Sequence, residues 1–312
     1  MKRIAFAAAF IVTAAIAPAS AWNDEGHMVV AAVAYDQLTP KAKARVAQLL
    51  ALSKYPTNGK NNVSPADQAK AAFMMAATAP DAIKFDPSHF KDDGEDPTNA
   101  KRAPNPSRNT GFDDPYMHRY WHYIDLPFST DASKLVQPPN INAEERIALF
   151  RKTLSSNAPD EQKAFDLVWL LHLVGDIHQP LHAASRFAQT GSKSHGDTGE
   201  NSVKLCDRPC RDQLHGFWDG VLGNGENVSA AISEAGKLPK PDQSDVSKSD
   251  EAVWVQESFQ TAQKVVYADP IGDGNGPFTL TPAYRANAKK EAATRVALAG
   301  ARLANLLNTE LK

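Results

Sequence analysis

Cysteine is scarce in this chain: its 312 residues include only Cys206 and Cys210. In an exported protein so close a pair favours one local disulfide. A C-x-x-x-C pair is also compatible with part of a metal site, but no further cysteine supports that reading. We therefore expect a disulfide between Cys206 and Cys210.

Positive charge is also in short supply. The 34 basic residues include Lys2 and Arg3 of an N-terminal leader, so the rest of the chain carries 32 basic and 36 acidic side chains, a net charge of −4 with histidine neutral. An acidic chain is a poor candidate for a protein that holds nucleic acid chiefly by neutralising phosphates. If the substrate is a phosphate, metal ions must supply most of the positive charge.

Long apolar stretches are missing, apart from a short one at the N-terminus. Residues 1–21 combine the basic Lys2 and Arg3, an apolar run over 4–16 and an Ala-Ser-Ala cleavage site, which is the pattern of a cleavable signal peptide. The run is too short and too interrupted to span a bilayer as a mature helix. We expect a periplasmic or secreted protein that begins at Trp22 and has no membrane segment in its mature form.

Cleavage of the signal peptide would create an α-amine on Trp22, with a pKa of about 7.7–8. That amine lies five positions before His27. A free amine and an imidazole can chelate a metal together, which an internal tryptophan cannot do. The alternative is a signal peptide followed by an ordinary first residue.

Alternation of apolar and polar residues with a period of two is rare, whereas helical signals recur along the chain. At Thr39 and Pro40, for example, a capping residue precedes a proline at the first helical position. The helices are expected over 27–38, 39–52, 64–81, 142–154, 160–180, 213–222, 250–266 and 284–311.

The remaining segments of the sequence limit the possible fold classes. Residues 201–205 form the only plausible strand, while 85–115 and 238–249 are rich in residues typical of loops. No internal repeat or clean linker divides the chain. We expect residues 22–312 to form one all-α domain, mainly helical, with one short β-hairpin at most.

A segment near the middle of the chain carries three histidines and an aspartate within eleven residues. His172 and Asp176 are four positions apart, so their side chains leave the same face of a helix. That face has apolar neighbours, and a buried imidazole and carboxylate are costly unless they are partnered, for example by a metal. Pro180 ends or kinks the helix, which lets His182 swing back towards the same centre. His178 and His182 are also four apart, so spacing does not decide which binds metal. The alternative is one satisfied core histidine and two surface histidines.

The evidence for each of the other candidate ligands is weaker when that residue is considered alone. His215 and Asp219 repeat the four-residue spacing, but an ordinary helical ion pair explains them equally well. His122 lies in an aromatic stretch, and an aspartate in the position of Asp81 is more often a helix cap than a ligand. The full set of donor groups comprises the Trp22 amine and carbonyl, His27, Asp81, His122, His172, Asp176, His182, His215 and Asp219. Nitrogen and carboxylate ligands without thiolates suit Zn²⁺, and ten donor groups fit three ions with open positions for water.

At these residues the chain resembles the S1/P1 nuclease family, exported zinc-dependent nucleases that share a helical fold with bacterial zinc phospholipase C. The match extends from Trp22 to about residue 220, with weaker support in the C-terminal third. Every ligand position of the family is occupied in order: Trp22 with His27, Asp81 followed by Lys84, His122 followed by Asp125, His172 with Asp176 and His182, and His215 with Asp219. The resemblance implies the phospholipase C/P1 nuclease type of helical domain.

The resemblance also implies three Zn²⁺ sites. The first would be held by Asp81, His122, His172 and Asp176, and the second by His182, His215 and Asp219. The third would be held by the Trp22 amine and carbonyl with His27, and Asp176 would bridge the first and third. His178 has no counterpart among the family's ligands.

The implied substrates are single-stranded DNA and RNA, cut at their P–O3′ bonds to leave 5′-phosphates, and 3′-mononucleotides. Tyr123 would stack on a base while Asp125 and Asn201 bond its edge, a mode that needs unstacked nucleotides. Asp81 would orient or deprotonate the attacking water, and Lys84 would contact a phosphate oxygen. The enzyme is expected to be a monomeric endonuclease with 3′-nucleotidase activity.

Two departures and two rival functions remain open. Glu200 stands where the family usually has glycine, which puts base preference in doubt, and the loop over 85–115 is longer than the family's connection. One rival is a phospholipase C-like phosphodiesterase, which would favour glutamate at the position of Asp219. The other is a non-catalytic zinc-binding exported protein, which would have no need of Lys84 or Tyr123.

Overall fold

The computed structural model describes residues 22–55, 63–95, 115–188, 196–199, 201–206, 212–225 and 227–311. The expected signal peptide over 1–21, Glu200, Cys210 and most of the loop over 85–115 lie outside this part of the chain, so the expectations about them stay predictions. The longer helices are α1 (Asp24–Gln37), α2 (Pro40–Leu50), α3 (Gln68–Ala76), α5 (Ala143–Leu154), α6 (Asp160–Asp176), α8 (Val228–Ala235), α10 (Glu251–Thr261) and α11 (Pro282–Glu310). The shorter ones are α4 (Ala79–Ala82), α7 (Leu214–Asp219) and α9 (Gln243–Val246).

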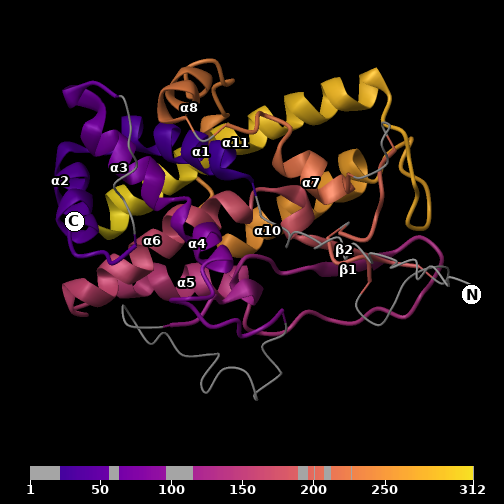
Figure 1. The fold of residues 1–312 in the computed structure, drawn as a ribbon, viewed down its shortest axis with the longest axis horizontal. Coiled ribbons are helices and arrows are strands. Elements are labelled where there is room, and N and C mark those ends of the chain that lie inside the picture. The colour runs from indigo at the N-terminus through magenta and orange to yellow at the C-terminus, as the bar shows by residue number, and fades with distance from the viewer. Residues whose placement is uncertain are drawn as a thin grey trace, which may run out of the picture.

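Helix α6 forms the centre of the core. Its first turn carries Asp160 and Glu161, whose charges complement the helix dipole, and every residue from Ala164 to Asp176 is buried. A helix that is covered on all sides belongs in the interior. Helices α1, α2, α5 and α11 all pack against α6, and Figure 1 shows α5 running alongside it. Because Asp176 is the last residue of α6, the helix delivers a carboxylate into the interior.

The predicted helix starts are confirmed where a side chain caps the first turn. The hydroxyl of Thr39 accepts a hydrogen bond from the backbone N–H of Ala42 at 3.2 Å, with Pro40 at the first helical position. The side chain of Asn142 accepts from the N–H of Glu145 at 3.2 Å in the same way. The mainly helical fold follows from these local signals together with the burial of the apolar faces.

The strands differ from the expectation. Strand β1 (Leu126–Ser129) pairs in parallel with β2 (Ala184–Phe187), with Leu126 opposite Ala184. A parallel pair needs a long crossover and is no hairpin, and here α5 and α6 provide the crossover. The strand expected over 201–205 is reduced to isolated bridges at Lys204 and Leu205. Four-residue strands are too short to show a period of two in the sequence.

The C-terminal third also departs from the expected elements. Helix α10 continues as a π-helical turn over Ala262–Val266, where one α-helix over 250–266 was expected. Helix α9 lies within the expected loop over 238–249, and α8 was not predicted. Within the described ranges, no helix has both the length and the apolar character needed to traverse a bilayer.

Candidate metal centre

Three groups of buried histidines and aspartates meet beside the end of α6. In each group, one nitrogen or oxygen atom from every member lies within 4.8 Å of the others. The groups are His27, Asp81 and His172; His122, His172 and Asp176; and His182, His215 and Asp219. The structure therefore brings together every histidine and aspartate that the sequence suggested as a metal ligand.

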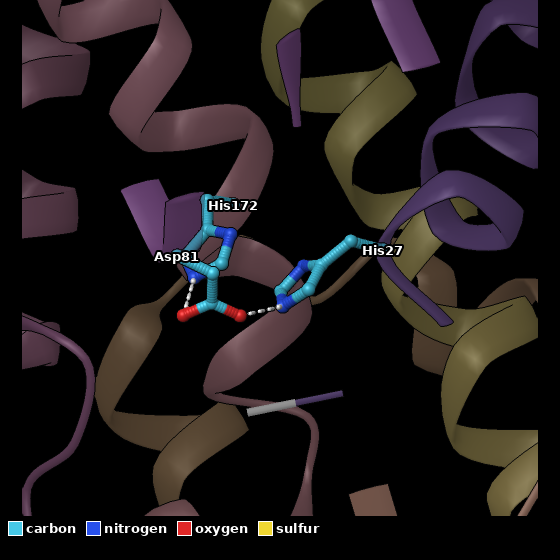
Figure 2. Close-up of side chains that lie close together, drawn as sticks. All are labelled: His27, Asp81 and His172. Carbon is cyan, nitrogen blue, oxygen red and sulfur yellow. Dashed lines mark ion pairs between the residues drawn. The ribbon is translucent and has the colours of Figure 1, made fainter. Parts of the chain in front are cut away.

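The first group joins three elements that are far apart in the sequence. Figure 2 shows the carboxylate of Asp81, from α4, placed between His27 of α1 and His172 of α6. The oxygens of Asp81 lie 3.5 Å from His172 Nε2 and 3.9 Å from His27 Nε2. The two imidazole rings are stacked with their centroids 3.8 Å apart. All three side chains therefore present donor atoms to one small buried space.

Asp176 lies between two sets of imidazoles. Its Oδ1 is 3.2 Å from His27 Nε2, whereas its Oδ2 is 3.0 Å from His122 Nδ1 and 3.3 Å from His172 Nε2. The two oxygens of one carboxylate thus face different ligand sets. That placement is what a bridging ligand requires.

The group of His182, His215 and Asp219, called the second metal group below, comes after the turn that follows α6. The Nε2 atoms of His182 and His215 are 3.2 Å apart, and Asp219 Oδ2 lies 3.5 Å from His215 Nε2. The amide of Gln179 donates to the other oxygen of Asp219 at 2.7 Å. Gln179 is a supporting residue that the sequence analysis missed, although it lies inside the histidine-rich segment.

Backbone carbonyls orient three of the imidazoles. His172 Nδ1 donates to Ala77 O at 2.7 Å, and His182 Nδ1 donates to His122 O at 2.6 Å. His215 Nδ1 bonds Gly199 O, and a Cβ on Gly199, which has φ of +63°, would lie 2.5 Å from Leu181 O. With Nδ1 fixed in this way, Nε2 of each ring carries its lone pair towards the centre. These outer contacts are typical of metal-binding histidines.

The polar atoms of the centre fit a cation. His27 Nε2 and Asp176 Oδ1, which face each other in the centre, are buried and have no hydrogen-bond partner within the described part of the chain. Burial alone lowers the pKa of His172, but the adjacent Asp176 and Asp81 carboxylates raise it to about 10. The negative charges of these two carboxylates therefore strongly favour a positive charge beside them. Imidazole and carboxylate donors without thiolates suit zinc.

The N-terminal segment is anchored between the ligand groups. Trp22 is fully buried, and its indole N–H donates to Gly175 O at 3.1 Å, one residue before Asp176. The backbone N–H of Asn23 donates to Asp219 O at 3.2 Å. The side chain of Trp22 therefore fixes this end of the described chain beside both groups.

Lys84 and Asp81 form a buried ion pair at the edge of the first group. Lys84 Nζ lies 2.7 Å from Asp81 Oδ1, and both side chains are almost completely buried. Burial acts to raise the pKa of Asp81, but the charges of Lys84 and of the nearby imidazoles hold it well below its usual range. Asp81 is therefore ionised and faces both a lysine and two histidines.

Tyr123, Asp125 and Asn201 flank the second metal group. The segment of Tyr123 and Asp125 pairs with the backbone of His182, through the N–H of Ile124 at 2.9 Å. The Tyr123 hydroxyl donates to Glu95 O at 2.7 Å, which fixes the ring.

The other two residues each contact one member of that group, and the backbone N–H of Asp125 donates to His182 O at 3.5 Å. The amide nitrogen of Asn201 lies 3.5 Å from His215 Nδ1. Burial and the neighbouring carboxylates of Asp197 and Glu95 raise the pKa of Asp125 well above its usual range.

His178 points away from the metal groups. Its Nδ1 bonds Val174 O at 2.8 Å, and its Nε2 lies 3.0 Å from Nη1 of Arg302. Both ring nitrogens are therefore satisfied in the core. The structure places His182, and not His178, among the candidate ligands.

Comparison with known proteins identifies the family. No protein with a curated description matches the chain. The model of the family described as S1/P1 Nuclease matches residues 22–312, nearly the whole chain. This family is zinc-dependent, and its members are nucleic-acid hydrolases that are typically exported. The chain therefore belongs to the S1/P1 nuclease family.

Proposed function

We propose that the chain is an endonuclease that hydrolyses the P–O3′ bonds of single-stranded DNA and RNA, leaves 5′-phosphates and removes the phosphate from 3′-mononucleotides. The observation that carries this proposal is the presence of three buried His/Asp groups, in each of which the donor atoms lie within 4.8 Å of one another. Zinc bound by these groups would supply positive charge for a phosphoryl group and lower the pKa of water. An acidic chain, with a net charge of −4 once the leader is removed, can then act on an anionic substrate.

We infer three zinc ions, held by the residues that the family resemblance assigns. Asp81, His122, His172 and Asp176 would hold the first, and His182, His215 and Asp219 the second. His27 would hold the third with the amine and carbonyl of Trp22. The position of the Asp176 oxygens between His27 and His122 supports its role as the bridge between the first and third ions.

Asp81 and Lys84 are proposed to act on the water and the phosphate. The ionised carboxylate of Asp81 would orient the attacking water or accept its proton. Lys84, 2.7 Å from that carboxylate, is placed to bind a non-bridging phosphate oxygen as negative charge builds there. Water attacks phosphorus as the bond to the 3′-oxygen breaks; the 3′-oxygen takes up a proton from solvent, and the proton lost by the attacking water is released to solvent.

Tyr123, Asp125 and Asn201 are proposed to bind the base of the nucleotide that keeps its 3′-oxygen. Base stacking on Tyr123 requires a base that has left its neighbours, which favours single strands over duplexes. The raised pKa of Asp125 favours a neutral carboxyl group, which can both donate to and accept from a base edge.

A phospholipase C-like phosphodiesterase and a non-catalytic zinc protein are the rival functions. The presence of aspartate at position 219 speaks against the first. The buried Lys84–Asp81 pair speaks against the second, because a purely structural metal site has no need of a lysine at its edge.

Zinc analysis combined with activity assays tests the proposal. The purified mature protein should contain three zinc ions per chain and hydrolyse single-stranded DNA, RNA and 3′-AMP, with duplex DNA cut more slowly. Three zinc ions without hydrolysis of any of these substrates would contradict the catalytic proposal. Preferential hydrolysis of phosphatidylcholine would favour the phospholipase.

We further propose that residues 1–21 are a signal peptide and that 22–312 form one domain. Removal of the leader frees the Trp22 amine for metal binding. The mature protein would then act in the periplasm or outside the cell, as a monomer. Mass spectrometry of the exported protein gives its first residue directly.

A further inference from the structure

Phe85 is an aromatic side chain left in solvent at the edge of the metal centre. It is 62% exposed, more than any other large hydrophobic side chain in the described residues. It closes the 3₁₀ turn Ile83–Phe85, which directly follows α4. The two residues before it, Ile83 and Lys84, are buried. The exposure of Phe85 is therefore not shared by the turn that carries it.

The turn that presents Phe85 is held in place. The N–H of Asp86 donates to Ile83 O at 3.1 Å, and Arg119 donates from Nη2 to Lys84 O at 3.3 Å. Phe85 follows Asp81 by four residues, so the two side chains leave the same face of this helical segment. The ring thus has a fixed position relative to the candidate catalytic carboxylate.

Phe85 and Asp81 line the same cavity. The cavity has a volume of about 290 Å³, and Asn23, Asp24 and Asn224 lie on its other wall. Asn23 donates from its amide to Gly223 O at 2.5 Å and to Asn224 Oδ1 at 2.8 Å, so this wall is preformed. A recess of this size is near the lower end of the range for small-molecule sites.

The lining of the cavity selects the kind of group it can hold. Among the described residues, the lining contains the ring of Phe85, the amides of Asn23 and Asn224 and the carboxylates of Asp24 and Asp81, with no lysine or arginine. An uncharged planar ring can stack on Phe85 and reach the amide of Asn224 with its edge. The residues proposed to bind the first base, Tyr123, Asp125 and Asn201, are not part of the lining.

We propose that this cavity is a second base subsite, in which Phe85 stacks on the base of the nucleotide that follows the cleaved bond. The inference rests on the proposed nuclease function. In that function the Tyr123 subsite takes the nucleotide that keeps its 3′-oxygen, because 3′-mononucleotides are also substrates. The next nucleotide, which leaves with the 5′-phosphate, would then lie on the other side of Asp81, beside Phe85. The second subsite makes the enzyme prefer polymers to mononucleotides.

The test compares a dinucleotide with a 3′-mononucleotide. Phe85→Ala should lower the ratio of kcat/KM for the dinucleotide to kcat/KM for the 3′-mononucleotide by about fivefold to 150-fold, the range for the loss of one base stack. Phe85→Trp should keep the ratio near that of the unaltered enzyme. Leu52→Ala, which removes another exposed apolar side chain at the end of α2, is the matched control and should not change the ratio.

A dinucleotide without the base on its 3′ nucleotide separates stacking from other effects. The unaltered enzyme should cleave this abasic substrate more slowly, and Phe85→Ala should cause no further loss with it. An unchanged ratio for Phe85→Ala, or an equal loss with the abasic substrate, would overturn the second subsite while leaving the nuclease function intact. If the unaltered enzyme hydrolyses neither substrate, the proposed function itself fails.

Discussion

Asp176 joins two ligand sets of the candidate metal centre, because each of its two oxygens faces a different set. Oδ1 faces His27 and Oδ2 faces His122 and His172. Burial alone raises the pKa of this carboxyl group, but the charges and hydrogen bonds of the three imidazoles hold it well below its usual range. A buried carboxylate that stays ionised among donors is a strong ligand for a divalent cation.

Asp176→Ala should therefore remove two metal ions together. Loss of a ligand is expected to cost more than the roughly 10- to 100-fold typical of outer-shell partners, so activity should fall by more than about 100-fold. Zinc content per chain and kcat on single-stranded DNA measure the two effects. Asp67→Ala, which removes a carboxylate from the turn Pro65–Asp67, is the control. Retention of full metal content and activity in Asp176→Ala would refute the bridging role.

Tyr123 offers a second test at the scale of one residue. Tyr123→Ala should weaken substrate binding by about 1–3 kcal/mol, the range for stacking on one base, with the zinc content unchanged. Tyr123→Phe keeps the ring and loses only the hydrogen bond to Glu95, so it should lose less. Apparent affinity for 3′-AMP distinguishes the variants, and equal affinity in all of them would remove Tyr123 from the site.

Two His–Asp pairs of the centre could be predicted from the sequence because a four-residue spacing puts two side chains on one helix face, whereas His27, Asp81 and His122 were assigned through the family resemblance. His172 with Asp176 and His215 with Asp219 both follow that rule, and both pairs face a metal group. Partners such as Ala77 O and Gly199 O were not predictable, because any residue type supplies a carbonyl. Their identity depends on tertiary packing that the spacing does not encode.

At the scale of elements, the turn after α6 is held from behind by α10 and α11. Ser258 is fully buried and donates from its hydroxyl to Ile177 O at 2.5 Å, while Arg295 of α11 donates to the Ser258 hydroxyl and to His178 O. Ile177 and His178 directly follow Asp176. The contacts therefore fix the backbone between the ligands at the end of α6 and those beyond the turn.

Ser258→Ala should destabilise the protein by about 1–3 kcal/mol, because a buried carbonyl and a guanidinium lose their shared partner. The free energy of unfolding in urea measures this loss. Ser247→Ala, which removes an exposed hydroxyl bonded to Ser244 O, should change stability far less. Equal stability of the two variants would show that the turn does not depend on Ser258.

Elements with strong local signals were predicted and those that depend on distant pairing were not. Helix α6 has an acidic first turn and a long apolar run, so its existence was clear from the sequence. The pairing of β1 with β2 depends on a crossover of more than fifty residues, and neither strand has a turn signal that would reveal its partner. Helix α9 is only one turn long, and helix propensity does not predict a helix this short.

At the scale of the whole molecule, the candidate centre brings together residues that are far apart in the sequence. Its residues run from Trp22 to Asp219, and the N–H of Asn23 donates to the carbonyl of Asp219. The N-terminal segment thus completes a site built mainly by α6 and α7. In the proposed centre, binding of the third ion would therefore depend on where the mature chain starts.

An extra residue ahead of Trp22 should therefore abolish one metal site while the fold persists. The added peptide bond removes the α-amine as a ligand, but the buried indole and its bond to Gly175 O remain. We expect two zinc ions per chain in place of three, and a large loss of activity, with an unchanged circular dichroism spectrum. Full zinc content and undiminished hydrolysis in the extended protein would refute the role of the amine.

Removal of all metal should destabilise the whole molecule, because the ligand groups join α1, α4, α6 and α7. Without cations, the buried carboxylates of Asp81, Asp176 and Asp219 lose partners that offset their burial. A ligand at a free concentration of 100 times its Kd stabilises the folded state by about 2.7 kcal/mol per site. EDTA should therefore lower the Tm by several degrees or more, and added zinc should restore it where added magnesium does not, since imidazole ligands favour zinc. A Tm that stays constant while elemental analysis shows the zinc to be gone would mean that the fold does not depend on the metal centre.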